Sequence, residues 1–302
     1  MNRTDTQKTP KEPSRADLEK RKARLHRIVG AGIRLVFFAA MPSAFATGFS
    51  GVKYLMTSIG KGEALTMNSF VWTLIGLLIF TFVFGRFFCG YVCAFGTLGD
   101  AVYSVSAWIQ KKVFHRKKPL TIPQRAQRPL QKVKYLVLAV LVLMCAFGSY
   151  SLLTGWSPWD VFSRLTAFQS PAAGYIGGAV LLAVIVIGMA FQPRFFCQFL
   201  CPMGALFSLM PILPFSAVKS HPEHCIKGCQ NCRKNCPVGI KPGEDKFLDG
   251  ECVACEKCMY ACPKENISRP MQKIIRIDWL SLILKAALFF VMGVFLGLCR
   301  FF

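Results

Sequence analysis

Eight of the fourteen cysteines in this 302-residue chain are gathered between residues 225 and 263, in two runs of four. The first run is Cys225, Cys229, Cys232 and Cys236. The second run is Cys252, Cys255, Cys258 and Cys262. Each run ends directly before a proline, and the second has the C-x2-C-x2-C-x3-C-P spacing that holds iron–sulfur clusters. We therefore expect the fold of this segment to be organised around its cysteines.

The spacing predicts two [4Fe-4S] clusters with crossed ligands. Three closely spaced thiolates on a tight loop can hold one face of a cubic cluster, while the fourth cysteine, before proline, reaches the other cluster. The first cluster would be held by Cys225, Cys229, Cys232 and Cys262. The second would be held by Cys252, Cys255, Cys258 and Cys236.

Disulfides and zinc are the two alternatives for these cysteines. Disulfides need an oxidising compartment, and residues 1–27 are too long and polar for the start of a cleavable signal peptide. Zinc ribbons pair two C-x-x-C knuckles, whereas each run here has three cysteines plus one in a terminal Cys-Pro. The pattern favours iron–sulfur clusters over both.

Most of the remaining chain is apolar. Hydrophobic residues make up 53% of the sequence and the mean hydropathy is +0.42, which predicts a membrane protein. Five apolar runs are expected to span a membrane: residues 28–49, 70–88, 135–153, 176–196 and 279–298. Pro42 is expected to kink the first of them.

The net charge of +22 raises the question of nucleic acid binding. The basic runs flank the apolar ones, as cytoplasmic loops of membrane proteins do, and no motif that reads nucleic acid accompanies them. We therefore expect a membrane and no nucleic acid as the partner of this charge.

The predicted fold is a membrane all-α domain of about five transmembrane helices, with a small cytoplasmic α+β ferredoxin domain that binds two clusters. The expected parts are a basic cytoplasmic tail at 1–27, a four-span membrane domain at 28–218, the ferredoxin domain at 219–272 and a last transmembrane helix at 273–302.

Two stretches of the apolar part match each other and indicate a duplicated two-span unit. They are Arg86-Phe-Phe-Cys89-Gly-Tyr-Val-Cys93 and Arg194-Phe-Phe-Cys197-Gln-Phe-Leu-Cys201. Cysteines four residues apart share one helix face, so two facing motifs would present four thiols to one point. Soft thiolates suit copper(I) or a further iron–sulfur centre. Arg86 and Arg194 would lower the thiol pKa values and balance negative charge. The alternative is that these cysteines are small packing residues.

Other polar and aromatic residues are given simpler roles. Asp100 is expected to be a surface cap, and His26, among basic residues, is expected to be solvated. Trp156 and Trp159 beside a proline indicate an interfacial belt, with a quinone-binding or partner-docking edge as the functional alternative.

The paired C-x3-C motifs followed by the two cysteine runs resemble the NapH/NosR/CcoG-type membrane polyferredoxins, over about Arg86 to Pro263. The resemblance implies a multi-pass protein of the bacterial inner membrane, with its ferredoxin domain in the cytoplasm. It also implies electron transfer, often between quinol and a periplasmic reductase. Ala94, where the second motif has Pro202, departs from the pattern.

We expect an electron carrier or oxidoreductase subunit that passes electrons between a cytoplasmic donor or the quinone pool and a membrane or periplasmic redox partner. One alternative is a cupric reductase that uses the C-x3-C thiols during oxidase assembly. Another is a membrane regulator that senses redox state.

Overall fold

A computed structural model of the chain describes residues 15–113, 115, 122–166, 168–169, 173–213, 216–220, 222–240, 250–269 and 278–299. The longer helices are α1 (Arg15–Ala40), α2 (Ala44–Lys61), α3 (Ser69–Phe84), α4 (Ala94–Lys112), α6 (Val133–Ala146), α8 (Ile176–Phe191) and α14 (Asp278–Phe295). The shorter α-helices are α5 (Gln124–Leu130), α7 (Pro158–Thr166), α9 (Phe195–Phe199), α10 (Pro202–Leu209), α11 (Asn231–Lys234) and α12 (Lys257–Ala261). The remaining turns and strands are η1 (Phe88–Val92), η2 (Ser149–Trp156), η3 (Ala173–Tyr175), η4 (Pro222–His224), β1 (Lys219–Ser220) and β2 (Ile267–Ser268).

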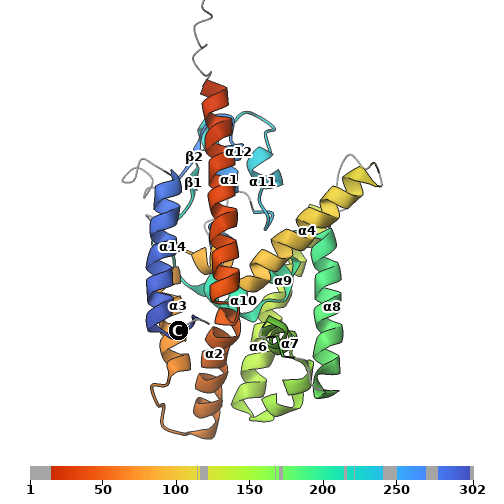
Figure 1. Cartoon of the computed structure of the whole chain (residues 1–302), viewed down its shortest axis with the longest axis vertical. Coiled ribbons are helices and arrows are strands. Elements are labelled where there is room, and N and C mark those ends of the chain that lie inside the picture. The colour runs from red at the N-terminus through yellow and green to blue at the C-terminus, as the bar shows by residue number, and fades with distance from the viewer. Residues whose placement is uncertain are drawn as a thin grey trace, which may run out of the picture.

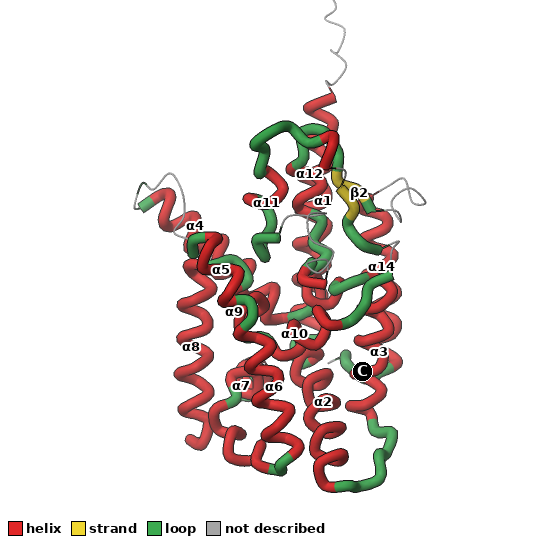
Figure 2. The backbone as a smooth tube through the Cα atoms, turned by 180° about the vertical axis from the view of Figure 1, so that it is seen from behind, coloured by secondary structure: helices red, strands yellow, loops and turns green. Residues whose placement is uncertain are grey.

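The long helices pack into one body that carries the cysteine-rich segment at one end (Figures 1 and 2). Helix α2 packs against α3 and α6, both α4 and α7 pack against α8, and α1 packs against α14. Helices α11 and α12 lie beside the first half of α1, with β1 and β2 near them. The two cysteine runs therefore sit on top of the helical body.

Aromatic side chains fill the core where the two C-x3-C motifs meet. Phe95, which follows the first motif, stacks on Phe196 of the second with ring centroids 4.7 Å apart. Phe88 packs edge-on against Phe207 at 5.9 Å. Such pairs add to the burial free energy of the rings and join the two motifs in one core.

The bend expected at Pro42 is confirmed. Helix α1 ends at Ala40, α2 begins at Ala44, and the two axes differ by 62°. Proline lacks the backbone N–H of a continuing helix, and its ring clashes with the preceding turn.

The prediction of about five transmembrane helices is wrong. Among the described residues, only Ala126–Ala146, which joins α5 and α6, is by itself long and apolar enough to cross a membrane. The bent pair Glu19–Ala40 and Ala44–Lys61 would make a second if it counted as one span. The other apolar runs form the shorter helices Ser69–Phe84, Ile176–Phe191 and Trp279–Phe295.

Backbone breaks explain why the apolar runs overstate the helices. Gly85 ends α3 with a φ of 71°, and Gly148 follows α6 with a φ of 69°. Helix α8 ends before Gln192, and Arg194 adopts a φ of 54°. Left-handed residues stop a helix although the sequence around them stays apolar.

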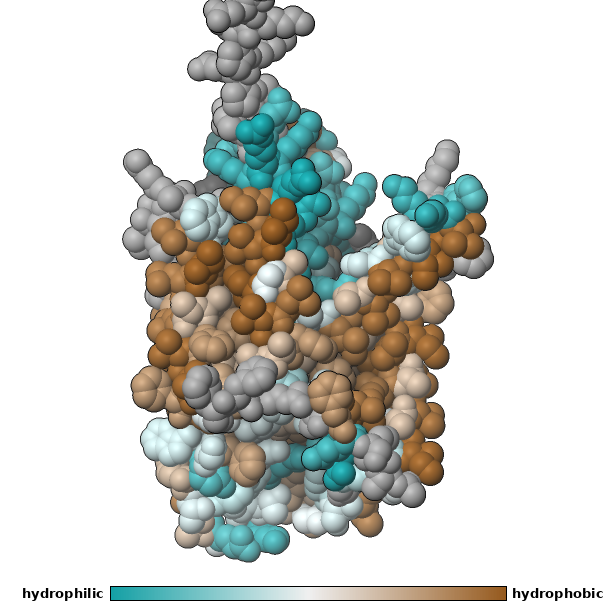
Figure 3. Space-filling view, viewed as in Figure 1, coloured by the Kyte–Doolittle hydropathy of each residue, from teal (hydrophilic) through white to brown (hydrophobic). Residues whose placement is uncertain are grey.

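The outer surface of the helical body carries many large apolar side chains. Figure 3 shows them over the middle of the molecule, whereas hydrophilic residues cover the start of α1 and the end of α4. On α8, Val184 and Ile187 are 56% and 60% exposed, and on α6 Leu136 is 64% exposed. A contiguous apolar surface of this kind marks contact with a membrane or another protein.

The predicted α+β fold of the cysteine-rich segment also overestimates its β-structure. Its described sheet has two strands of two residues, β1 and β2, paired antiparallel with Lys219 opposite Ser268. This pair joins the beginning and end of the segment. Between the strands the described chain is mostly loop, which the cysteines shape.

Candidate metal centres

The four cysteines predicted to hold the first cluster line one cavity. It has a volume of about 360 Å³, and its lining includes Cys225, Cys229, Cys232 and Cys262. Asn266, which the sequence analysis missed, donates its backbone N–H to Cys262 Sγ at 3.4 Å and its side-chain Nδ2 to Cys225 Sγ at 3.5 Å. Hydrogen bonds to sulfur are one means by which a protein tunes a cluster. The structure therefore brings the predicted set together and adds a polar neighbour.

The four cysteines of the second predicted set also come together. Cys255 and Cys258 are each 8% exposed. Burial first, and then the nearby Cys255 and Cys252, raise the pKa of the Cys236 thiol to about 12. Cys236 of the first run thus lies beside the second run, as crossed ligation requires.

Both runs turn through left-handed backbone just before their second cysteine. Gly228 has a φ of 76° and Ala254 a φ of 54°, and Glu256 follows with 59°. Left-handed residues occur in backbone turns whose N–H groups bind anions, so the shared conformation is compatible with a negatively charged group at each loop.

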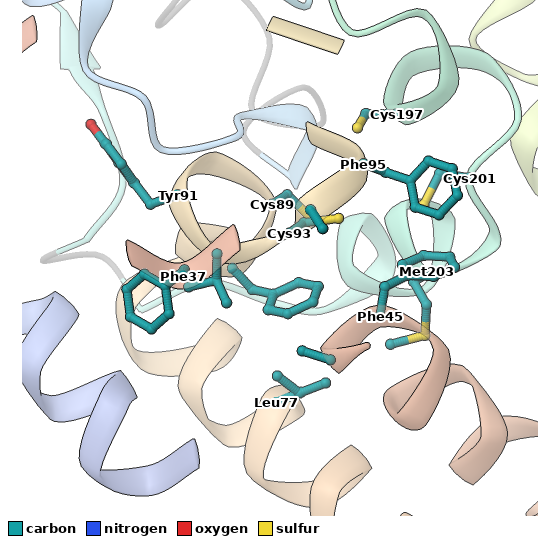
Figure 4. Close-up of a cluster of buried hydrophobic side chains, with 14 of the residues drawn as sticks. Phe37, Phe45, Leu77, Cys89, Tyr91, Cys93, Phe95, Cys197, Cys201 and Met203 are labelled. Carbon is teal, nitrogen blue, oxygen red and sulfur yellow. The ribbon is translucent and has the colours of Figure 1, made fainter. Parts of the chain in front are cut away.

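The C-x3-C cysteines form a third group, buried under the second run. Cys89, Cys93, Cys197 and Cys201 are each 4–5% exposed and lie in one region of the core (Figure 4). Burial raises the pKa of the Cys201 thiol, and the neighbouring thiols of Cys197, Cys89 and Cys93 raise it further. We call these four residues the inner quartet.

The cysteines of each motif do not share one helix face, which corrects that expectation. Cys89 lies in the π-helical turn η1 and Cys197 in α9, whereas Cys93 and Cys201 precede the first residues of α4 and α10. In the second motif Cys201 Sγ accepts the N–H of Gly204 at 3.1 Å. Each motif therefore places one thiol before a helix N-terminus, where the helix dipole favours negative charge.

Among the described residues, no site for a single metal ion is formed by three or more His, Cys, Asp or Glu side chains. A group of four thiolates suits an iron–sulfur cluster, in which each thiolate binds a different iron.

Each motif's arginine donates hydrogen bonds to backbone carbonyl oxygens near another cysteine group. Arg194 donates to the carbonyl oxygens of Cys89 and Gly90, the latter at 2.9 Å. Arg86 Nη1 donates to Gly250 O at 3.2 Å, just before the second run. Both side chains are 1% exposed. Each arginine therefore positions backbone outside its own motif.

The expected effect of the arginines on thiol ionisation is only partly right. Burial is the largest influence on Cys197 and raises its pKa, while Arg194 and Arg86 lower it and Cys89 raises it. The net result is a pKa of about 11. Desolvation outweighs the two cations because all of these groups are buried.

Asp100 and His26 are not the surface residues that the sequence suggested. Burial would raise the pKa of Asp100, but Arg194, bonded at 2.9 Å, and nearby cations lower it to about 2. His26 is 5% exposed, and its Nε2 lies 3.2 Å from the hydroxyl of Tyr91. Arg194 of the second motif holds the Asp100 side chain in the interior, and Tyr91 of the first motif holds that of His26.

Close backbone contact joins the inner quartet to the second run. A Cβ on Gly90 would stand 2.4 Å from Val253 O, so only glycine fits there. Tyr91, also inside the first motif, donates its hydroxyl to Cys255 O at 3.3 Å. The first set includes the exposed Cys225, the second set includes the buried Cys255 and Cys258, and all four cysteines of the inner quartet are buried.

An apolar cavity of about 330 Å³ lies between α6, α7 and α8. Its lining includes Phe196 and Leu200, which precede Cys197 and Cys201 in the sequence. It also includes Tyr150 and Trp159, whose polar atoms are buried; the Tyr150 hydroxyl interacts with Trp159 and Ser157. The rest of the lining is aliphatic and aromatic, so this cavity is suited to an apolar ligand.

Some predicted features lie outside the described residues, including the tail before residue 15 and the loop at 241–249. The sequence analysis also missed Glu251 and Glu256, which form buried ion pairs. The available signal was Lys285, inside the apolar run at 279–298, and Lys134, directly before the run at 135–153, because a buried charge requires a partner.

Comparison with known proteins places the chain among iron–sulfur proteins. A family model described as a 4Fe-4S binding domain matches residues 66–119 and 175–213, the ranges that contain the inner quartet. An uncharacterised protein of Methanocaldococcus jannaschii is 31% identical over 191 residues, which is 63% of this chain and 67% of that protein.

Relatives with functional names agree with that match. The ferredoxin-type protein NapH of Haemophilus influenzae is 26% identical, over 64% of this chain and 66% of its own length. YccM of Escherichia coli, assigned to electron transport, is 28% identical over 71% of this chain and 59% of its own length. No solved structure matches the chain. The cysteine groups, the 4Fe-4S family model and these relatives together show that the chain belongs to the NapH-type polyferredoxins, a family of iron–sulfur electron-transfer proteins.

Proposed function

We propose that this protein transfers electrons between a soluble redox partner and a membrane or membrane-bound partner, with an iron–sulfur cluster at each of its three cysteine groups. The observation that carries the proposal is their arrangement in series, from an exposed group to a buried one joined by the Gly90–Val253 contact. When bound, such clusters supply one-electron transfer.

The first two groups would hold [4Fe-4S] clusters with crossed ligands. The cavity lined by Cys225, Cys229, Cys232 and Cys262 supports the first set. Burial raises the pKa of Cys258, and its neighbours Cys252, Cys255 and Cys236 raise it further. The proximity of these four thiols supports the second set. Cys225 is exposed, so a soluble partner can approach the outer group directly.

The inner quartet would hold a further iron–sulfur centre rather than one copper ion. The matched 4Fe-4S family ranges include these four cysteines, which supports an iron–sulfur centre at the quartet. Soft thiolates would also accept copper(I).

We further propose that the helical body attaches the protein to a membrane. The apolar band in Figure 3 and the helix Ala126–Ala146 support this proposal. The cysteine-rich end would lie on the cytoplasmic side, because the basic start of α1 lies beside it and basic segments favour that side.

The apolar cavity beside α9 would bind a quinone ring. Its wall is almost entirely aliphatic and aromatic, as the face of a quinone ring requires. A volume of about 330 Å³ falls within the range of small-molecule sites. A ring bound there would lie against the segment that carries Cys197 and Cys201.

Electron paramagnetic resonance (EPR) of serine variants tests the proposed ligand sets. After dithionite reduction, Cys262→Ser should alter the signal of the outer cluster and Cys236→Ser that of the second, although each residue belongs to the opposite run. Cys145→Ser is the matched control, since Cys145 is buried in α6 apart from the three groups. An unchanged spectrum in both ligand variants would refute the crossed assignment.

A further inference from the structure

A buried carboxylate with two cations flanks the inner quartet on the side of Arg86. Glu251 Oε2 lies 3.4 Å from Arg86 Nη1 and also contacts Lys134 Nζ. Both cations have side chains that are 1% exposed. One carboxylate cannot neutralise two cations, so this group retains a formal charge of +1.

The free edge of Arg86 faces the inner quartet. Its Nε and Nη2 atoms are buried, and Cys89 is a hydrogen-bonding neighbour of the guanidinium. A Cβ on Gly204 would stand 3.0 Å from Nη2, and Cys201 interacts electrostatically with the guanidinium. A buried guanidinium in a group with excess positive charge calls for an anion, and the quartet is where that anion would lie.

A second group of one carboxylate and two cations lies at Arg194. Asp100 Oδ2 is 2.9 Å from Arg194 Nη2 and 3.6 Å from Arg34 Nη1. Arg194 also donates to Cys89 O, and its positive charge opposes the rise that burial causes in the pKa of Cys197. This group again retains a formal charge of +1, beside the quartet's other motif.

A third such group lies under the second cysteine run. Glu256 Oε1 is 3.2 Å from Arg269 Nη1 and 3.7 Å from Lys285 Nζ. Arg269 lies close enough to Cys252 and Cys258 to interact electrostatically with both thiols. The two inner cysteine groups are therefore surrounded by three buried sets of charges, each with one positive charge in excess.

The outer cysteine group has a different environment. Its basic neighbours Lys227 and Lys264 are exposed, and Cys225 is exposed as well. Water screens a surface charge strongly, whereas a buried charge acts at a lower effective dielectric constant. The same number of cations therefore has a smaller effect at the outer group than in the core.

We propose that Arg86 and Arg194, with the excess charge of their ion-pair groups, stabilise the reduced, more negative state of the centre held by the inner quartet. This inference rests on the proposed iron–sulfur centre at the quartet. Reduction adds one negative charge next to cations that are already buried, so their electrostatic cost falls as the electron arrives. Removing a cation should then disfavour reduction, and removing a carboxylate should favour it.

A redox titration followed by EPR on the purified, cluster-loaded protein tests this with substitutions of opposite sign. Arg86→Gln removes a cation and should reduce the one-electron equilibrium constant of the inner centre about tenfold, a shift of about 59 mV to lower potential. Glu251→Gln removes the carboxylate of the same group and should shift it to higher potential. Arg86→Lys keeps the charge and should restore most of the loss.

A purely structural role for these residues would shift both neutral variants in the same direction, or not at all, and either result would overturn the proposal. Lys264→Gln is the control, an exposed cation by the outer group, and should leave all potentials nearly unchanged. If Arg86→Gln does not retain iron, Glu251→Gln alone decides, because a shift to lower potential or none contradicts the inference.

Iron analysis separates this inference from the function on which it rests. If Cys89→Ser and Cys201→Ser leave the iron content of the wild type unchanged, the centre at the quartet is wrong and the inference fails with it. If those variants lose iron but Arg86→Gln and Glu251→Gln leave the potential of the inner centre unchanged, only the inference fails.

Discussion

Gly90 shows how a single residue without a side chain can join two parts of the molecule. It lies between Cys89 and Tyr91, and the carbonyl oxygen of Val253 occupies the position of its missing Cβ. The same residue accepts hydrogen bonds from Arg194 and Arg34 through its own carbonyl oxygen. The spacing of the inner quartet from the second cysteine run therefore depends on this contact.

Gly90→Ala should destabilise the protein, since the added methyl would lie 2.4 Å from Val253 O and backbone must move. Overpacking of this kind costs about 1–3 kcal/mol. Thermal unfolding of the cluster-loaded protein measures it. Gly32→Ala in α1 is the control, because nothing lies within 4 Å of its added Cβ, and it should be neutral or stabilising. Equal effects of the two substitutions would contradict the contact.

Asp100 predicts a pH dependence of stability. Its pKa falls from the ordinary value of 3.8 to about 2 in the folded chain. A lowered carboxylate pKa stabilises the fold above the unfolded pKa, and this contribution is lost as the pH falls from about 4 towards about 2. The wild type should exceed Asp100→Asn in unfolding free energy by about 2 kcal/mol at neutral pH.

The comparison with Asp100→Asn is made at each pH, because loss of clusters in acid affects both proteins equally. The advantage of the wild type should shrink steadily below about pH 4. An advantage that stays constant down to pH 2 would show that the carboxylate does not titrate as the ion pair requires.

At the scale of elements, the sequence located the apolar helices but overestimated their lengths. The run at 176–196 contains α8, yet the helix stops at Phe191 because Gln192 is extended and Arg194 is left-handed. Hydropathy averages over such breaks, since Phe195 and Phe196 beyond them are as apolar as the helix. The kink at Pro42 could be predicted because proline acts locally, whatever the tertiary packing.

The exposed face of α8 provides a test of membrane attachment. Ile187→Lys, at a side chain that is 60% exposed, should weaken retention of the protein in vesicles, since a lysine near the membrane centre costs about 2.5–3.5 kcal/mol. Co-flotation with vesicles measures this. Leu65→Lys, in the loop between α2 and α3, is a control of similar exposure, 55%. If both variants float like the wild type, α8 does not face lipid.

At the scale of the whole molecule, the chain places the second cysteine run against the inner quartet and puts buried charged residues beside both. The regular spacing of the cysteines was enough to predict which of them lie together in the first two groups, because three members of each group are close in sequence. The ion pairs were not predictable, since Arg86 meets Glu251 and Arg194 meets Asp100 only after the chain has folded. The inner quartet falls between these cases, because its repeated motif was visible but its position under the second run was not.

The central claim is that the inner quartet holds an iron–sulfur centre in addition to the two of the cysteine-rich segment. The most direct measurement is iron and acid-labile sulfide per chain in anaerobically purified protein, compared with the double variant Cys197→Ser, Cys201→Ser. We predict about twelve irons in the wild type and about eight in the variant, four irons for each cluster. About eight irons in both proteins would contradict the claim and leave the quartet as packing residues of the core.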